Sequence, residues 1–470
     1  MTLPARLRRL AAVLLLLSAA CIPSAAAAER LSAFVGGTLI DGSGSPPIPD
    51  AALLVAGDRI LAVGPAAEVP IPGDAARVDT SGRWIIPGLI DAHVHFFQSG
   101  GIYTRPDILD LRAVRPYAVE IEEIRKRLPK TLARYLASGV TGVVDLGGPY
   151  WNFEVRALAQ SLRVAPRVAV AGPLLATYAP SELAGPAGPP MIRISTAAEA
   201  EAEVERQLRR APDLVKIWFV RPGRDLGREL TWIRAAIAAS HAAGVRVVAH
   251  ATQPRVAQAV VGAGADILAH SVEEGFVDDS LLAAMRARDA IYIPTLAVGQ
   301  GYAAVFGRHV RLSPIEQRLG DPDAIASFDD LDAVPRHLVP GWVRPRRPQP
   351  LDPMVVENLR RVQAHGIRIA AGSDAGNIGT LHGPALHREL ELMVQAGLTP
   401  LQALTAAAQG GAAVMGRSAD LGTLAPGKLA DLVVLAADPL ADIRNTQRIH
   451  RVVKGGEMFD PEEIRRELAR

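Results

Sequence analysis

Cysteine is almost absent from this sequence, which has a single cysteine among 470 residues. A disulfide framework and a cysteine-based metal or nucleophile site are therefore excluded, and any metal ion must be held by histidine, carboxylate or a modified residue. An excess of charge of one sign is also lacking, because 51 lysines and arginines face 49 acidic residues. Such a balanced chain lacks the excess of positive charge that nucleic-acid-binding proteins use to bind phosphates. The composition likewise excludes disorder, collagen-like repeats and a coiled coil.

The N-terminal apolar run, Leu10–Ala20, has about 11 residues, whereas a helix that spans a membrane needs about 20. Arginines at positions 6, 8 and 9 precede this run, and the small residues Ser24–Ala28 follow it. A basic segment, a short apolar segment and an Ala-x-Ala-like end are typical of a secretory signal. We therefore predict that residues 1–28 are a signal peptide and that the mature protein is secreted or periplasmic, without a membrane span.

Cys21 lies within this segment and would be removed with it, which leaves a cysteine-free protein in an oxidising compartment. The alternative is a lipid anchor at Cys21, because Ala19-Ala20-Cys21 fits a lipobox. Ser18 stands where a lipobox has leucine, so the sequence favours cleavage after Ala28 over lipid anchoring.

The two ends of the sequence, 29–84 and 421–470, resemble each other in texture. Both carry short strand patterns separated by turn residues. The strand candidates are Ala33–Ile40, Ala52–Val55, Ile60–Val63, Ala76–Asp79, Leu432–Leu435 and Ile449–Val453. Neither end makes a convincing core alone, and chain termini usually lie close together. We therefore predict a small β-sandwich built from both ends.

The middle of the chain, 85–420, alternates apolar strand candidates with helical patterns that often end at glycine. The strand candidates are Gly88–Val94, Thr141–Leu146, Arg167–Ala171, Leu214–Phe219, Val245–Ala249, Asp266–His270, Ala290–Leu296 and Ile367–Gly372. Eight strands with crossovers predict an α/β fold, a (β/α)8 TIM barrel. An open doubly wound sheet is the less favoured alternative.

The segment of about 300–352 interrupts this alternation. It is rich in proline and arginine, as in the run 344–348. A long loop on the catalytic face of a barrel is often a lid or a binding loop. A disordered or packing insertion explains the segment almost equally well, so its role stays open.

Polar side chains fall at the ends of the predicted barrel strands. They are His93, His95, Lys216, His250, His270 and Asp374. Side chains two apart on a strand face the same way, and active sites of barrels collect at the carboxyl ends of the strands. Six groups from five strands are thus expected to meet at one point. Because buried charges are costly unless they are paired or bind a metal, we predict a metal site there.

Three sequence motifs resemble one known family, the metal-dependent amidohydrolase superfamily. The opening motif is Pro87-Gly88-Leu89-Ile90-Asp91-Ala92-His93-Val94-His95, and the closing motif runs from Leu421 to Leu435. Tyr292-Ile293-Pro294-Thr295-Leu296 is similar to the imidazolonepropionase-like and Xaa-Pro dipeptidase-like branch. The resemblance covers nearly all of 31–460, and with the six polar residues in order it is specific.

The resemblance implies two divalent metal ions, bridged by a Lys216 side chain that CO2 has carboxylated. One ion would be held by His93, His95, the carbamate and Asp374, and the other by His250, His270 and the carbamate. Nitrogen and oxygen ligands without thiolate suit zinc, although manganese, iron or cobalt also fit. A hydroxide bridging the two ions would attack the substrate, and Asp374 would accept and pass on the proton.

The implied enzyme is an amidohydrolase that cleaves a C–N amide bond of a small substrate: a dipeptide, an N-acyl amino acid or a cyclic amide. Candidate substrate contacts are Tyr178, Arg221, Tyr292 and His382. The residues after Lys216 are larger than the branch leads us to expect, which leaves the substrate open. Hydrolysis of phosphotriesters or lactones, a one-metal deaminase and a non-catalytic binding protein are the alternatives. The oligomeric state also stays open, and a homo-oligomer is compatible with the sequence.

Overall fold

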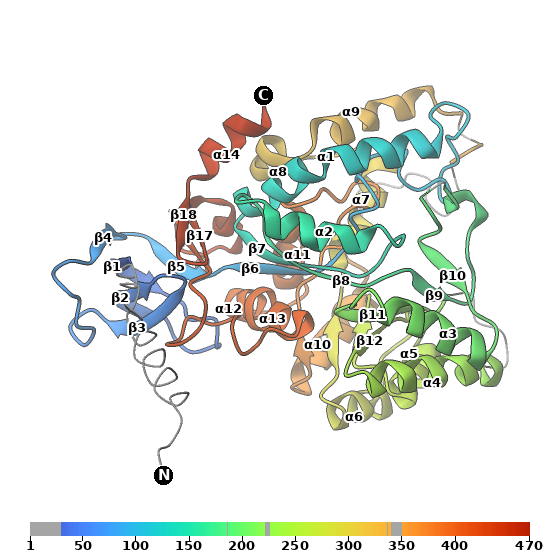
Figure 1. Ribbon diagram of the computed structural model, residues 1–470, viewed down its shortest axis with the longest axis horizontal. Helices are drawn as coiled ribbons and strands as arrows, with labels where there is room; N and C mark the ends of the chain where they lie inside the picture. Colours follow the sequence, from blue (N-terminus) through green and yellow to red (C-terminus); the bar gives the residue numbers. More distant parts are fainter. Residues whose placement is uncertain (1–29, 186, 221–225, 336, 340–349) are drawn as a thin grey trace, which may run out of the picture.

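The computed structural model describes residues 30–185, 187–220, 226–335, 337–339 and 350–470. Figure 1 shows two parts side by side, a smaller part of β-strands and a larger part in which helices surround parallel strands. The predicted signal peptide, 1–28, with Cys21, falls outside the described residues.

Both ends of the chain share one eight-stranded sheet, in the order β18-β17-β16-β5-β1-β2-β3 with β4 beside β1. Its strands are β1 (Leu31–Leu39), β2 (Ile48–Ala56), β3 (Arg59–Pro65), β4 (Ala76–Asp79), β5 (Trp84–Pro87), β16 (Leu432–Leu435), β17 (Ile449–Lys454) and β18 (Glu457–Phe459). The two ends meet where β5 pairs with β16, with Ile86 opposite Val433. Alternation along β2 sends Leu53 and Leu54 to opposite faces, each packed on its own apolar cluster. The β-rich part predicted from both ends is therefore one sheet with apolar residues on both faces.

The eight expected barrel strands are present in the larger part and pair in parallel. They are β6 (Leu89–Val94), β7 (Val140–Asp145), β8 (Arg167–Val170), β11 (Leu214–Trp218), β12 (Arg246–His250), β13 (Ile267–Ala269), β14 (Ile291–Ile293) and β15 (Arg368–Ile369). Regular pairing is interrupted at β8/β11 and at β15/β6, where single bridges join Ala171 to Leu214 and Ala375 to Val94. The predicted α/β fold of the TIM-barrel type is confirmed.

Two short strands were not expected from the sequence. β9 (Leu174–Ala176) pairs with the edge of β11, and β10 (Met191–Arg193) pairs with β9. They lie in the connection between β8 and α3 (Ala197–Leu208) and extend the sheet beside the barrel.

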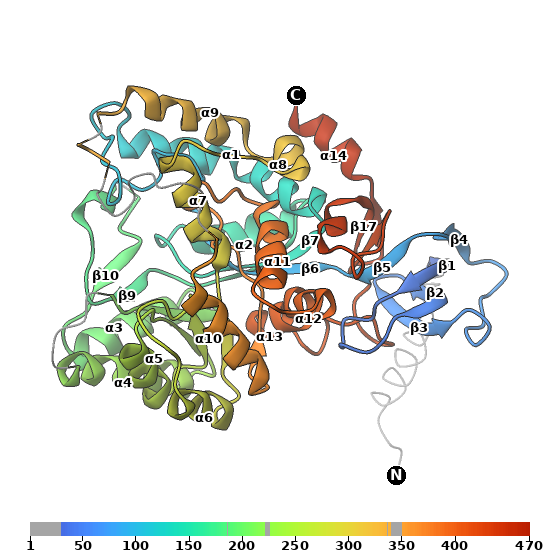
Figure 2. The same ribbon diagram turned by 180° about the vertical axis from the view of Figure 1, so that it is seen from behind.

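The remaining helices lie around the strands and over their ends (Figures 1 and 2). They are α1 (Tyr117–Ala137), α2 (Asn152–Ser161), α4 (Gly227–Ala242), α5 (Pro254–Ala263), α6 (Asp279–Ala287), α7 (Leu296–Phe306), α8 (Pro314–Leu319), α9 (Pro322–Asp330), α10 (Pro353–Ala364), α11 (Ala385–Gln395), α12 (Pro400–Thr405), α13 (Gly411–Met415) and α14 (Pro461–Leu468). Local signals explain many boundaries. For example, α5 begins at a proline and ends at Gly264, whose φ of 119° favours glycine.

The apolar core has two layers in the barrel. Alternate strand residues point into the barrel, as Ile291 and Ile293 do in β14, and form one cluster. The residues between them, such as Tyr292, belong to a larger cluster beneath the outer helices. Because side chains alternate along a strand, the register of each strand decides which of its residues can reach the barrel interior.

The segment 300–352 is not simply a loop. It contains the end of α7 and the whole of α8 and α9, and 336 and 340–349, with the arginine- and proline-rich run, lie outside the described residues. Val305 and Phe306 pack with Ile102, Leu109 and Leu111 from the connection after β6. The packing alternative therefore holds for the described part, because apolar residues anchor it beside the barrel.

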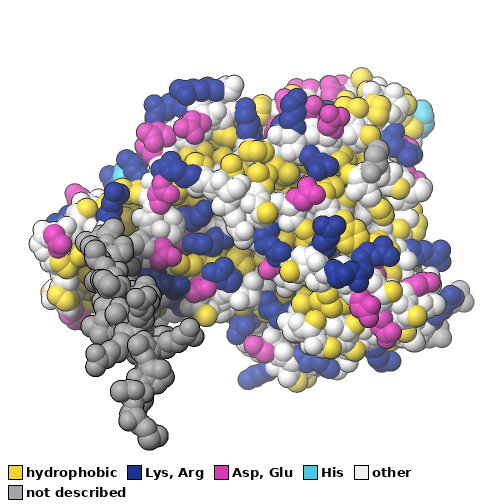
Figure 3. All heavy atoms as spheres, viewed as in Figure 1, with side chains coloured by type: hydrophobic (Ala, Val, Ile, Leu, Met, Phe, Trp, Pro, Cys, Tyr) yellow, Lys and Arg dark blue, Asp and Glu magenta, His cyan; other side chains and the backbone are white. Residues whose placement is uncertain are grey.

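On the face drawn in Figure 3, basic and acidic side chains are interspersed, as the balanced composition suggests. Within the described ranges, no helix combines the length and the apolar character needed to cross a membrane.

Candidate metal centre

The six polar residues predicted from the sequence do meet at the carboxyl ends of the barrel strands. His93 lies in β6, Lys216 in β11 and His250 at the end of β12. His95, His270 and Asp374 follow β6, β13 and β15 in the chain. The ladder of parallel strands brings these ends to one rim, which is why residues 281 positions apart in the sequence become neighbours.

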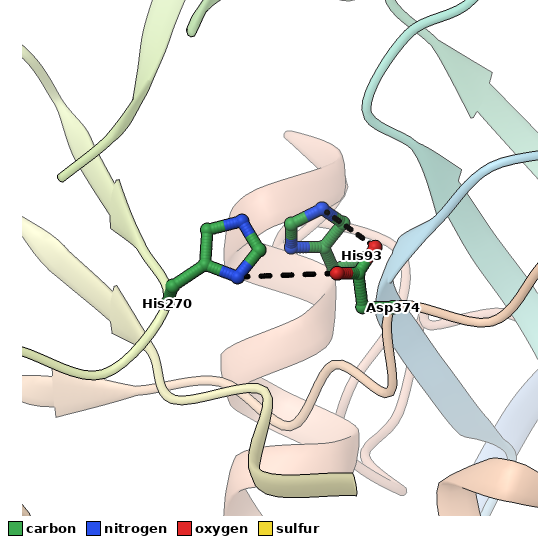
Figure 4. A group of neighbouring side chains, drawn as sticks. All are labelled: His93, His270 and Asp374. Atoms are coloured by element: carbon green, nitrogen blue, oxygen red, sulfur yellow. Dashed lines mark ion pairs between the residues drawn. The ribbon is translucent and has the colours of Figure 1, made fainter. Parts of the chain in front are cut away.

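A buried trio forms the centre of this site. His93, His270 and Asp374 each offer a ligand atom, and these atoms lie within 4.8 Å of one another. Nε2 of His93 is 3.4 Å from Oδ1 of Asp374, and Nδ1 of His270 is 3.9 Å from Oδ2 (Figure 4). The two imidazoles and the carboxylate gather at the ends of three strands around one small space, as the ligands of a metal centre do (Figure 4).

The other two histidines extend the cluster. Nε2 of His95 lies 3.3 Å from Oδ1 of Asp374 and 3.3 Å from Nε2 of His93. The ring of His250 is centred 4.2 Å from that of His270. Four imidazoles therefore surround the same small volume.

Lys216 lies among these rings and is almost completely buried, with 1% of its surface exposed. Its Nζ has no hydrogen-bond partner among the described residues. Burial lowers the pKa of its amine, and the charge of Asp374 opposes this shift. A desolvated amine without a partner is readily neutral, and a neutral amine is the form that reacts with CO2.

Burial also sets the protonation of the imidazoles. It lowers the pKa of His95 and of His250 to about 3 and moves the pKa of His93 and His270 well below the usual range. At neutral pH all four rings are therefore uncharged and keep a nitrogen lone pair, which is the state that binds a metal ion.

The donor atoms fit a divalent metal ion. His93 Nδ1, Lys216 Nζ and Asp374 Oδ1 are buried without a hydrogen-bond partner within the described part of the chain. Buried polar atoms without partners cost free energy, and a metal ion bound beside Lys216 and Asp374 would give their atoms a partner. Several imidazole nitrogens with a carboxylate and no thiolate suit zinc and related ions.

Asp91, in the middle of β6, holds two ligand-bearing segments in place. Its Oδ1 accepts hydrogen bonds from the backbone N–H of Ser373 at 2.9 Å and of His93 at 3.3 Å, and its Oδ2 accepts one from the Ser373 hydroxyl. Asp91 thereby ties the strand of His93 to the segment of Asp374. It lies in the opening motif, but the sequence offered no signal for this second role.

Gly147 orients His95. Its carbonyl oxygen lies 2.8 Å from Nδ1 of His95. Gly147 has a φ of 114°, and a Cβ added there would lie 2.6 Å from the carbonyl oxygen of Gly172. Asp145 accepts a hydrogen bond from the Gly147 N–H at 3.0 Å and fixes this turn. Glycine is therefore required at position 147 to hold its carbonyl oxygen against His95. A single sequence does not reveal this requirement.

Arg105, in the connection after β6, is a charged neighbour of the site that sequence reasoning missed. It binds both oxygens of Asp107 at 2.7 Å, and its Nη1 donates to the side chain of Asn377, three residues after Asp374. Its positive charge lowers the pKa of His95, His250 and Asp374, although burial is the larger influence on each. No strand-end pattern marks it, because it lies ten residues beyond His95.

Two of the four predicted substrate contacts have hydrogen-bond partners within the protein. Tyr292 points outward into the layer under the helices, where its hydroxyl accepts a hydrogen bond from the Val272 N–H. His382 is buried, with its ring nitrogens 2.7 Å from the Tyr135 hydroxyl and 2.8 Å from the Gln98 carbonyl. The register of β14 and the packing of His382 engage both side chains within the protein, and their contact with a substrate stays a prediction.

The other two predicted contacts remain predictions. Tyr178 follows β9 and is half-buried. Arg221 lies outside the described residues. Neither residue is assigned a role by the geometry of the metal centre.

Comparison with known proteins agrees with the fold and the site. The sequence model of the Amidohydrolase family matches residues 84–459, which span both the barrel and much of the β-rich part. The chain belongs to the amidohydrolase family, whose members are hydrolases that act on carbon–nitrogen bonds. This confirms the family predicted from the opening and closing motifs.

A curated relative, the imidazolonepropionase of Cereibacter sphaeroides, is 35% identical over 151 residues, which are 28% of this chain and 36% of the relative. The chain thus aligns with about a third of the length of that relative. A Xaa-Pro dipeptidase with bound methionine shares the fold with a TM-score of 0.68 at 20% identity, covering 92% of this chain and all of that one. A prolidase complexed with N-methylphosphonate-L-proline has a TM-score of 0.68 at 23% identity, with the same coverage. These similarities confirm the predicted branch of the family.

Proposed function

We propose that this protein is a binuclear metal-dependent hydrolase that cleaves the C–N amide bond of a small substrate. The observation that carries the proposal is the convergence of four neutral imidazoles, one carboxylate and one buried amine without a partner at the barrel mouth. A site for a single ion does not need six donor groups. Lys216 in particular makes no hydrogen bond that would give it a structural role among the described residues.

The proposed ligands divide between two ions as the resemblance implies. His93, His95 and Asp374 would hold one ion and His250 and His270 the other, with the carboxylated Lys216 between them. Zinc is the proposed metal, because neutral imidazoles and oxygen donors suit it and the described residues include no cysteine. When bound, such ions polarise a carbonyl oxygen and lower the pKa of a water molecule toward neutrality.

The protein's own groups supply proton transfer and orientation. Asp374 is the proposed general base, because its carboxylate faces the imidazoles and Lys216 in a buried site. Burial raises the pKa of Asp374, while the charges of Lys216 and Arg105 lower it, so the carboxylate can both accept a proton and release it to the leaving nitrogen. Asp91 and Gly147 keep the ligand side chains in register through the hydrogen bonds described above.

Dipeptides, N-acyl amino acids and cyclic amides are the proposed substrates. The similarity to an imidazolonepropionase and to dipeptidase structures supports a cyclic amide or a dipeptide. A panel of all three classes, with phosphotriesters and lactones added, tests this with zinc-loaded protein. Turnover confined to amides supports the proposal, and turnover confined to esters or phosphotriesters overturns it.

We further propose that residues 1–28 are a cleaved secretory signal and that the mature protein is periplasmic or secreted. The basic, apolar and small-residue segments of this stretch support the proposal. Mass analysis of the protein isolated from expressing cells tests it: a mature N-terminus at Glu29 is expected, and a lipid on Cys21 would show the anchor instead.

A further inference from the structure

Thr295, which joins β14 to α7, has an unusual role at the head of its helix. It occupies the N-cap position of α7, yet its side chain makes no capping hydrogen bond. Its Oγ1 instead lies 2.8 Å from Nδ1 of His270. A threonine at an N-cap position normally accepts a hydrogen bond from a backbone N–H of the helix. The Thr295 hydroxyl instead contacts His270 of the candidate metal centre.

The backbone of Thr295 adopts an unfavourable conformation in this arrangement. Thr295 has a φ of 47°, in the left-handed region that β-branched residues avoid. His270 and Asp374 also have left-handed backbones, with φ of 75° and 57°. Strained residues of this kind persist only where surrounding contacts hold them, and they gather at functional sites.

Glu389, on α11, takes over the capping of α7. Its Oε1 accepts a hydrogen bond from the Leu296 N–H at 3.0 Å, and its Oε2 accepts one from the Ala297 N–H at 2.7 Å. The side chain is completely buried, where α7 and α11 pack side by side (Figure 2). A buried carboxyl group is costly unless it is hydrogen-bonded, and the amino end of a helix is a favourable place for it.

We propose that Glu389 and Thr295 are positioning residues for His270. Glu389 caps α7 in place of Thr295, and Thr295 Oγ1 is thereby free to accept the Nδ1–H hydrogen bond of His270. This bond selects the tautomer whose Nε2 lone pair is available to a metal ion. The inference rests on the proposed function, because the tautomer of His270 matters only if its Nε2 binds a metal ion.

Two substitutions at position 295 separate the hydroxyl from the shape of the side chain. Thr295→Val keeps the β-branched shape, and hence the backbone strain, but removes the acceptor. Thr295→Ser keeps the acceptor. We expect zinc affinity, measured by competition with a chromophoric chelator, to fall by about 10–100-fold in Thr295→Val and to stay near wild type in Thr295→Ser. Equal losses in the two variants, or none, would overturn the proposal.

Glu389→Gln tests whether Glu389 is needed to cap α7. The glutamine amide NH2 is a donor, so one of the two backbone N–H groups at the start of the helix loses its acceptor. We expect Glu389→Gln to weaken zinc binding to a similar extent, and the double variant with Thr295→Val to be little worse than either single variant, because the two residues act in series. Glu203→Gln is the matched control: Glu203 is buried on α3 and hydrogen-bonded to Tyr150 and Gln207, away from the site. An equal loss of affinity in the control would show a general effect of the substitution and overturn the role of Glu389.

Imidazole ¹⁵N NMR of the metal-free protein distinguishes a failure of this inference from a failure of the proposed function. The expected spectrum has His270 protonated at Nδ1 in the wild type and in Thr295→Ser, and a mixture of tautomers in Thr295→Val. That result would support the positioning role even if the wild type bound no zinc, which would overturn the proposed function alone. A His270 protonated at Nε2 in the wild type would overturn the positioning role, and so would an unchanged tautomer in Thr295→Val. If Glu389→Gln does not fold, the NMR spectra of Thr295→Val and Thr295→Ser still test the positioning role of Thr295.

Discussion

The Nε2 atoms of His93 and His95 lie 3.3 Å apart inside the barrel mouth, and both also face Oδ1 of Asp374. Two neutral imidazoles so close can share one proton or bind one ion, and burial opposes the proton. The site is therefore better satisfied with a cation bound.

Removal of divalent ions should destabilise the protein. Ligands that bind only the folded state add free energy of unfolding, about 4 kcal/mol at a thousand times the dissociation constant. Calorimetry should show a lower unfolding temperature after treatment with a chelator and recovery on addition of zinc. Unchanged unfolding temperatures with and without zinc would contradict the metal assignment.

Asp374→Asn should abolish turnover while much of the metal stays bound, because an amide oxygen can still act as a ligand but cannot accept the proton. Loss of a general base lowers the rate by about 10²–10⁴-fold. Asp266→Asn serves as the control, since Asp266 precedes β13 at the opposite end of the barrel. Wild-type rates in Asp374→Asn would remove its proposed role as the base.

Gly147→Ala should disturb His95 without altering any ligand. The added Cβ meets a carbonyl oxygen at 2.6 Å in a backbone with a φ of 114°, and such strain costs about 1–3 kcal/mol. The Gly147 carbonyl would shift, and zinc affinity should fall. Gly244→Ala is matched, with a φ of 72° and open space around its Cβ. Its zinc affinity should equal that of the wild type, and equal affinities in both variants would contradict the role of Gly147.

The buried histidines His382 and His387 should each make the metal-free protein less stable as the pH falls below about 6.5. Burial lowers the pKa of His382 and of His387 to about 4, whereas an unfolded histidine titrates near 6.5. Between these values the unfolded histidines bind protons that the folded ones do not, so their contribution to the free energy of unfolding is fully present above 6.5 and decreases with falling pH. Urea denaturation at pH 7.5, 5.5 and 4.5 measures this, and His387→Gln should show a shallower dependence. An equal pH dependence in the wild type and in His387→Gln would contradict the burial of His387 as a neutral ring.

The convergence of the proposed ligand residues could be predicted from the sequence because one physical rule places them. Parallel strands end at a common rim, so His93, His250 and Asp374 had to meet once their strands were recognised. The β-rich part followed from its turn residues and from the closeness of the chain ends. The family resemblance added the proposal that Lys216 is carboxylated, which no pattern of spacing would have suggested.

Contacts that depend on register and packing could not be predicted. The apolar run Ala290–Leu296 suggested one long strand, but the strand ends at Ile293 and Thr295 already occupies the N-cap position of α7. Strand alternation then turned Tyr292 away from the mouth. The helices of the insert were missed because their stabilisation comes from residues distant in the sequence, such as Ile102 for α7 and α9 and Leu136 for α8, rather than from a local pattern.

The most direct test of the account is the metal content and carbamate content of the wild type and of Lys216→Ala. We predict two ions per wild-type chain, together with a carbamate ¹³C signal after incubation with labelled bicarbonate. Lys216→Ala should lose the signal, at least one ion and the activity, and short carboxylates should restore part of the activity. Lys454→Ala, which removes a partly buried lysine of β17, should match the wild type. Two firmly bound ions and full activity in Lys216→Ala, or no carbamate in the wild type, would contradict the account.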